Sequence, residues 1–270
     1  MTTIAGHLLA LSEKDPGRTA IYLQRAGQPD LPISYGRLMA GATAYSHAFT
    51  AEGMQPGEVI VLILQHGEEL IYAFWGAILC GAIPSIMPFL TEKLSPERYR
   101  ADLAALVAVT RPAAIVTYAE FEGEVHKALS GDSPVRKVFV VERVQPQVNP
   151  DQASPPGLMR NPGDIALLQH SSGTTGLQKG VALSHTAVFN QLNSYSKALD
   201  LNEQDVIVSW LPLYHDMGLI AGFLMPILTA VPLVLSSPFD WVRAPHRLLQ
   251  SVTEYKGSLT WLPNFAFNFL

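Results

Sequence analysis

One short segment in the second half of the chain concentrates residue types that bind phosphate. Residues 171–180 read SSGTTGLQKG, with three glycines, four hydroxyl side chains and one lysine. Glycines let the backbone bend sharply and bring its N–H groups close to an anion. The hydroxyls add donors, and Lys179 supplies a positive charge that can reach a phosphate. We therefore expect a loop suited to a triphosphate; a plain glycine-rich hairpin turn or linker is the alternative.

The flanking residues indicate how this loop is held. Residues 164–169 have the apolar content of a strand. The lysine is followed by Gly180, whereas a Walker A loop has Ser or Thr there and leads directly into a helix. Val181 and Leu183 alternate with small residues, as in a second strand, and Ser184 is a suitable helix N-cap. The loop is therefore predicted to join two strands.

Strand-like and helical patterns alternate along the chain. Helical spacing recurs from Tyr35 and again from Leu70, and Ser95-Pro96-Glu97 resembles a helix start. Short apolar runs of strand length occupy residues 59–64, 115–117, 138–141, 165–168, 206–210 and 233–235. The alternation predicts an α/β fold with largely parallel sheets flanked by helices.

Residues 144–163 are rich in proline and poor in apolar side chains, which predicts an exposed connection. We place a boundary there, with a first α/β subdomain at residues 1–150 and a second, incomplete one at residues 151–270 that carries the loop. Because the chain stops at Leu270 inside an apolar, helical stretch, we expect it to be a truncated fragment.

The composition narrows the class of protein. A formal charge of -5 with scattered Lys and Arg argues against nucleic acid as a partner. The single cysteine, Cys80, lies in an apolar run and is expected to pack in the core. One thiol cannot form an internal disulfide, and the N-terminus lacks a secretion signal, so we expect a cytoplasmic protein.

Two uncharged stretches, residues 70–90 and 217–239, are long enough to cross a bilayer. Glycines and prolines interrupt both, so each is predicted to be a buried helix that leads through a turn into a buried strand. No membrane span is expected, although a piece of a membrane transporter is the alternative that these stretches leave.

Three sequence blocks resemble the adenylate-forming superfamily. SSGTTGLQKG is similar to its phosphate-binding loop, [ST]SG[ST]TGxPKG, with Gln178 at the usual proline position. WLPLYHDMGLI at residues 210–220 resembles a segment of fatty acyl-AMP ligases and long-chain acyl ligases, and LPNFAF at residues 262–267 resembles their PNFAY segment. The resemblance implies the N-terminal domain of such an enzyme, with the small C-terminal domain absent.

This resemblance implies ATP-dependent conversion of a fatty acid into its acyl-adenylate, with ATP and Mg²⁺ as cofactors. Lys179 and His215 are the expected catalytic residues. The expected ATP-binding residues are Ser171, Ser172, Gly173, Thr174, Thr175, Gly176 and Lys179. The expected acyl and adenylate pocket comprises His215, Asp216, Met217, Gly218, Asn264, Phe265 and Phe267. A carboxylic acid is ionised at neutral pH, so this reaction needs positioning and charge neutralisation rather than a strong base.

Several alternatives stay open from the residues alone. His215 could be a packing residue, and the apolar pocket residues could be ordinary core. His215 and Asp216 lack further ligands at metal-binding spacing, and no GxSxG elbow is present. The acyl acceptor could be an acyl carrier protein or coenzyme A, and a non-catalytic nucleotide- or acyl-binding module is the competing class. We expect the isolated polypeptide to be inactive or nearly so.

Overall fold

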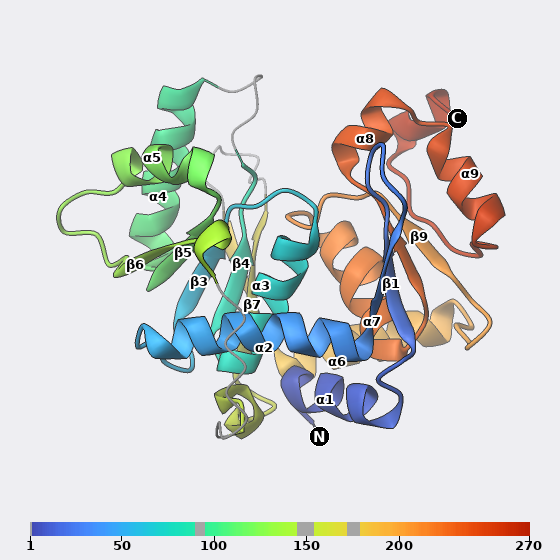
Figure 1. The fold of residues 1–270 in the computed structure, drawn as a ribbon, viewed down its shortest axis with the longest axis horizontal. Helices are drawn as coiled ribbons and strands as arrows, with labels where there is room; N and C mark the ends of the chain where they lie inside the picture. Colours follow the sequence, from blue (N-terminus) through green and yellow to red (C-terminus); the bar gives the residue numbers. More distant parts are fainter. Residues whose placement is uncertain (1, 90–94, 145–153, 172–178) are drawn as a thin grey trace.

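The computed structural model describes residues 2–89, 95–144, 154–171 and 179–270, which form two sheets with flanking helices (Figure 1). The α-helices are α1 (Ile4–Lys14), α2 (Tyr35–Ala51), α3 (Glu68–Cys80), α4 (Pro96–Thr110), α5 (Ala119–Ala128), α6 (His185–Ala198), α7 (Met225–Thr229), α8 (Pro238–Arg243) and α9 (Arg247–Glu254). Short 3₁₀ turns form η1 (Val141–Arg143), η2 (Pro156–Met159) and η4 (Asn264–Asn268), and η3 (Met217–Leu224) is a π-helix.

The larger sheet has six strands in the order β6-β5-β3-β4-β7-β8, and the smaller has four in the order β2-β1-β10-β9. Only β8 and β2 run antiparallel to their neighbours, which confirms the predicted largely parallel arrangement. The strands are β1 (Thr19–Leu23), β2 (Leu31–Ser34), β3 (Val59–Leu62), β4 (Ile83–Ile86), β5 (Ala114–Thr117), β6 (Lys137–Val140), β7 (Ile165–Ser171), β8 (Lys179–Ser184), β9 (Ile207–Ser209) and β10 (Leu233–Leu235).

Each sheet contains strands from both sides of residue 150. β7 and β8 extend the sheet begun by β3 to β6. In the smaller sheet β1, which pairs with β2, also pairs with β10 from near the other end of the chain, and β10 pairs with β9. The predicted division of the sequence is therefore not a division between the two sheets. The expected exposure of the connection is wrong at Gly157, which is buried. A Cβ there would lie 2.2 Å from the carbonyl oxygen of Ile78, so only glycine fits against the end of α3.

The two uncharged stretches are helices that turn into buried strands, as predicted. α3 ends at Gly81, whose φ of 78° is the left-handed conformation that glycine adopts easily, and β4 follows. η3 and α7 end at Ala230, also left-handed, and β10 follows. No helix among the described residues has the length and apolar character needed to cross a membrane.

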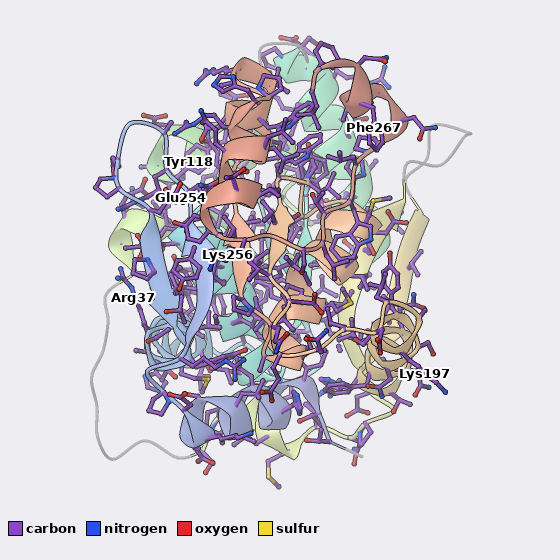
Figure 2. The ribbon with its side chains drawn as sticks, turned by 90° about the vertical axis from the view of Figure 1, so that its right-hand side faces the viewer. Arg37, Tyr118, Lys197, Glu254, Lys256 and Phe267 are labelled. Carbon is purple, nitrogen blue, oxygen red and sulfur yellow. The ribbon has the colours of Figure 1, made fainter. Side chains whose placement is uncertain are left out.

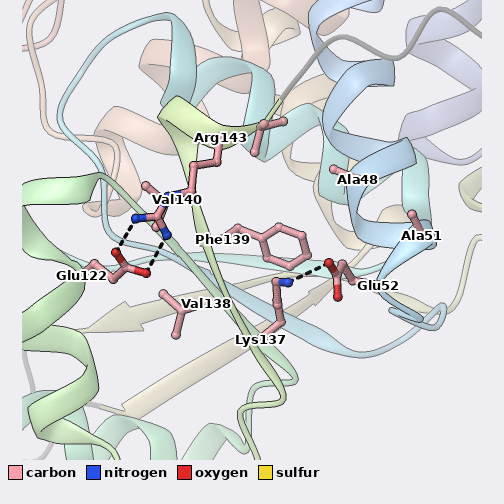
Figure 3. Close-up of a pocket in the computed structure, with 10 residues that line it drawn as sticks. Ala48, Ala51, Glu52, Glu122, Lys137, Val138, Phe139, Val140 and Arg143 are labelled. Atoms are coloured by element: carbon pink, nitrogen blue, oxygen red, sulfur yellow. Dashed lines mark hydrogen bonds and ion pairs between the residues drawn. The ribbon is translucent and has the colours of Figure 1, made fainter.

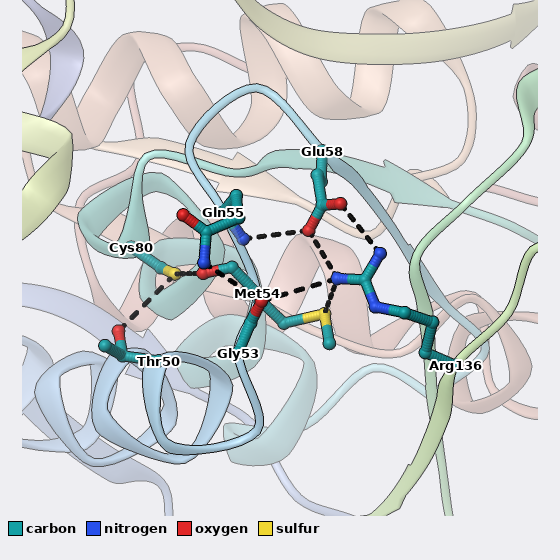
Figure 4. A network of polar contacts seen from close by, with 7 residues as sticks. All are labelled: Thr50, Gly53, Met54, Gln55, Glu58, Cys80 and Arg136. Atoms are coloured by element: carbon teal, nitrogen blue, oxygen red, sulfur yellow. Dashed lines mark hydrogen bonds and ion pairs between the residues drawn. The ribbon is translucent and has the colours of Figure 1, made fainter.

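Cys80 lies in the core, as predicted, with no exposed surface. Figure 4 shows its sulfur facing Thr50 Oγ1 at 3.7 Å and the Met54 carbonyl oxygen at 4.0 Å. Burial raises the pKa of the thiol, which favours the unreactive protonated form. Beside it, both guanidinium NH groups of Arg136 donate to the Glu58 carboxylate at 2.7 Å.

Candidate functional site

The predicted strand–loop–strand unit is present as the β7–β8 hairpin. Ser171 is paired with Lys179 and His170 with Gly180, so the two strands meet at the base of the loop. Ser184 Oγ accepts a hydrogen bond from the Ala187 N–H at 3.1 Å and caps α6, as predicted. Five predicted ATP-binding residues, Ser172, Gly173, Thr174, Thr175 and Gly176, lie outside the described residues. The side chains of Ser171 and Lys179 are not described either, so the phosphate-binding role stays a prediction.

A buried histidine precedes the loop and was not singled out from the sequence. His170 Nε2 lies 2.6 Å from Ser85 Oγ, and both side chains are buried. Ser85 belongs to β4, so this bond connects the neighbouring strands close to where the loop begins. Burial lowers the pKa of His170, which keeps the imidazole neutral. Only the strand pairing reveals this contact, because 85 positions separate the two residues.

The second predicted block follows the carboxyl end of β9. A turn is closed by the His215 N–H, which donates to the Pro212 carbonyl oxygen at 3.1 Å. His215 is exposed, and its ring lies 4.8 Å from that of Tyr214, centroid to centroid. His215 is therefore not part of the buried core of the described residues, and its role at the adenylate stays a prediction.

The Asp216 side chain makes a local hydrogen bond. Its carboxylate accepts a hydrogen bond from the Met217 N–H at 2.8 Å at the start of η3. Across the described part of the chain, no group of three or more His, Cys, Asp or Glu side chains is placed to hold a metal ion.

The fold brings two of the sequence blocks together around one cavity of about 310 Å³. Its lining is mainly apolar and includes four of the predicted pocket residues from residues 210–220, His215, Asp216, Met217 and Gly218, with Phe265 from residues 262–267. Asn264 and Phe267 do not line it, and Phe267 is 65% exposed at the molecular surface (Figure 2).

Two tryptophans support this cavity. Trp210 lines it and stacks on Trp241 of α8, with ring centroids 3.8 Å apart and planes 7° apart. Trp241 also meets the ring of Phe265 at a steep angle. Aromatic packing from α8 therefore brings residues 262–267 against residues 210–220.

A larger groove, of about 830 Å³, opens beyond Tyr214. It is lined by Phe89 after β4, His66 after β3 and Phe239 after β10, so it lies at the carboxyl ends of strands from both sheets. In open α/β sheets this edge is the usual place for ligands. The sequence did not single out His66, whose pKa burial lowers to about 4.

A third cavity, of about 430 Å³, lies at the outer edge of the larger sheet (Figure 3). Its two cations already have carboxylate partners. Lys137 Nζ lies 2.7 Å from Glu52, and Arg143 binds Glu122 through two nitrogens at 2.9 and 3.0 Å. It contains no motif residue, whereas the cavity beside His215 does, and that cavity is therefore the candidate site.

Comparisons with known proteins identify the family of the chain. The AMP-binding enzyme family model matches residues 10–270. The long-chain-fatty-acid–AMP ligase FadD26 of Mycobacterium marinum is 32% identical over 243 residues, which cover 87% of this chain and 40% of that protein. The 4-coumarate–CoA ligase CCL1 of Humulus lupulus is 30% identical over 77% of this chain and 38% of its own.

Among solved structures, the fatty acyl-adenylate ligase from L. pneumophila in complex with acyl adenylate and pyrophosphate superposes with a TM-score of 0.84 at 26% identity. The match covers 99% of this chain and 45% of that one. The chain thus spans about two fifths of the length of the curated relatives it matches. Because the family match extends over nearly all of its residues, the chain belongs to the AMP-binding enzyme family of the adenylate-forming superfamily.

Proposed function

We propose that the protein activates a fatty acid with ATP to give an acyl-adenylate and pyrophosphate, and then transfers the acyl group to an acyl carrier protein. The observation that carries this proposal is the cavity of about 310 Å³ that joins the two acyl-ligase blocks beside an exposed His215. The names of the relatives, a fatty-acid–AMP ligase and a fatty acyl-adenylate ligase, support the choice of substrate.

In the proposed step, a carboxylate oxygen of the acid attacks the α-phosphorus of ATP. A new P–O bond forms, the bond to the bridging oxygen breaks, and pyrophosphate leaves with that electron pair. The acid is ionised at neutral pH, so no protein base has to remove a proton. The protein contributes positioning and charge neutralisation.

Each part of the site has a proposed share in this step. The loop at residues 171–180, with Lys179, holds the β- and γ-phosphates. His215 contacts the adenylate, and Met217, Gly218 and Phe265 contact the acyl chain in a cavity whose lining is mainly apolar. Asn264 and Phe267 are proposed to act from the neighbouring η4 turn.

Mg²⁺ is commonly held by nucleotide phosphates and one or two carboxylates rather than by a protein cage. We propose that the ion arrives on the nucleotide. When bound, it would neutralise phosphate charge.

The decisive experiment is ATP–pyrophosphate exchange by the full-length gene product with fatty acids of increasing chain length and with 4-coumarate. We expect exchange with fatty acids. A protein that binds ATP but supports no exchange with any acid would be a non-catalytic module. Subsequent transfer to holo acyl carrier protein or to coenzyme A, compared directly, identifies the acceptor; coenzyme A stays the second candidate because a CoA ligase is among the relatives.

Lys179→Ala tests the loop. It should strongly reduce exchange, because the loop then loses its cation. Lys197→Ala in the last turn of α6 is the matched control, since it removes a lysine from an exposed surface of the same chain (Figure 2). Equal activity of the two variants would contradict the proposed role of Lys179.

The 270-residue chain by itself is expected to be inactive or nearly so, because it spans about two fifths of the relatives' length. Exchange by this chain at the rate of the full-length protein would contradict that expectation.

A further inference from the structure

The turn that presents His215 depends on a contact from a distant part of the chain. The turn runs from Pro212 to His215, and Leu213 is its second residue. The N–H at that position takes no part in the bond that closes a turn. Leu213 is only 1% exposed, so its N–H must find an acceptor within the protein. The acceptor is Nε2 of His66, at 3.1 Å.

His66 connects the two sheets at this point. It lies between β3, a strand of the larger sheet, and helix α3, whereas Leu213 follows β9 of the smaller sheet. A neutral imidazole has one acceptor nitrogen and one N–H. Because Nε2 accepts from Leu213, the proton belongs on Nδ1, which is shielded from solvent. The nearby backbone of Ser236, just after β10, raises the pKa of the same ring, against the larger effect of burial.

The position of Leu213 affects both the His215 imidazole and the cavity wall at Met217 and Gly218. Its turn ends at His215, so a displaced turn would move the exposed imidazole. The same turn packs against η3, because a Cβ on Gly218 would lie 2.2 Å from the Pro212 carbonyl oxygen. Movement of Leu213 would therefore also reshape the cavity wall at Met217 and Gly218.

We infer that His66 is a positioning residue for adenylate formation, which acts by holding the Leu213 N–H so that His215 and the cavity wall keep their alignment. This inference rests on the proposed function. His66 acts through the backbone of Leu213 and does not itself need to touch the reacting groups.

Two substitutions of His66 separate the effect of losing the hydrogen bond from the effect of changing the volume of the side chain. His66→Phe keeps an aromatic ring but removes the acceptor, whereas His66→Gln retains an acceptor oxygen on a side chain of similar reach. In exchange assays of the full-length protein, His66→Phe should lower kcat about tenfold, the effect expected when a buried donor loses its partner. The KM for the fatty acid should rise and the KM for ATP should stay unchanged, because the β7–β8 hairpin carries the phosphate loop. His66→Gln should recover most of the kcat.

Other outcomes overturn the inference. If wild type is active and His66→Phe keeps its kcat and fatty-acid KM, the inference fails while the proposed function stands. A kcat that falls only in proportion to the unfolded fraction of the variant, with no change in fatty-acid KM, would indicate a purely structural role. If wild type shows no exchange, the proposed function fails first. NMR of the imidazole nitrogens in wild-type protein then still tests the contact, since a proton on Nε2 would exclude Leu213 as its donor. The same measurement decides the matter if His66→Phe does not fold.

Discussion

Replacing Gly218 by alanine would test how closely the wall of the candidate cavity is packed. The new Cβ would lie 2.2 Å from the Pro212 carbonyl oxygen, 2.9 Å from its carbon and 3.1 Å from the Leu211 carbonyl oxygen. All three atoms belong to backbone, so no side-chain rotation relieves the contact. Either the turn before His215 or the start of η3 must move.

The cost of such overpacking is typically about 1–3 kcal/mol. In a chain of this size each kcal/mol lowers Tm by about 2–4 °C, so the expected fall is roughly 2–12 °C. Urea unfolding of Gly218→Ala should show a lower midpoint with an unchanged slope. In the full-length protein the fatty-acid KM should rise, because the displaced residues line the cavity.

Gly123→Ala is the matched control. Gly123 lies inside α5, and a Cβ there meets no atom within 4 Å. Because alanine is the better helix former, this variant should be more stable by about 0.5–1 kcal/mol. If Gly218→Ala unfolded at the wild-type urea concentration and kept the wild-type fatty-acid KM, the cavity wall at Gly218 would not be closely packed.

Two further predictions concern pH. His185 Nδ1 accepts the Ile4 N–H at 3.2 Å, and burial, aided by Arg160 and opposed by Asp164, lowers its pKa to about 4. The neutral imidazole should therefore stabilise the fold fully above the ordinary histidine pKa of about 6.5, and this stabilisation should be lost as pH falls toward 4. In His185→Asn the urea midpoint should depend less on pH across that range. A pH dependence of the midpoint equal to that of wild type would contradict this role of His185. The hydrogen bond from Arg136 lowers the pKa of Glu58, so this pair should stabilise the fold above the ordinary glutamate pKa and stop doing so as pH falls through the lowered value. Glu58→Gln should reduce that acid sensitivity, and because the pair is partly exposed its loss at pH 7 should cost no more than about 1 kcal/mol.

Local features of this protein could be predicted from its sequence. Ser95 and Ser184 cap helices where the pattern placed them, because capping involves a residue and the N–H three positions later. The apolar stretches at residues 70–90 and 217–239 turn from helix to strand at a left-handed residue. The hairpin around the glycine-rich loop follows from alternation and from Gly180 after the lysine. All of these depend on neighbours in sequence.

Contacts between distant segments could not be predicted from these local patterns. Alternating patterns indicate strands but not their partners, so the pairing of β1 with β10 and the mixing of early and late strands in both sheets could not be read from them. The same holds for the candidate pocket: its residues were named from sequence, but the arrangement of residues from 210–220 and of Phe265 around one cavity, with Asn264 and Phe267 outside it, came from packing. The bond from Leu213 to His66 spans 147 positions and involves a backbone N–H, which carries no sequence signal. Burial created the need for that acceptor, and burial is a property of the folded chain.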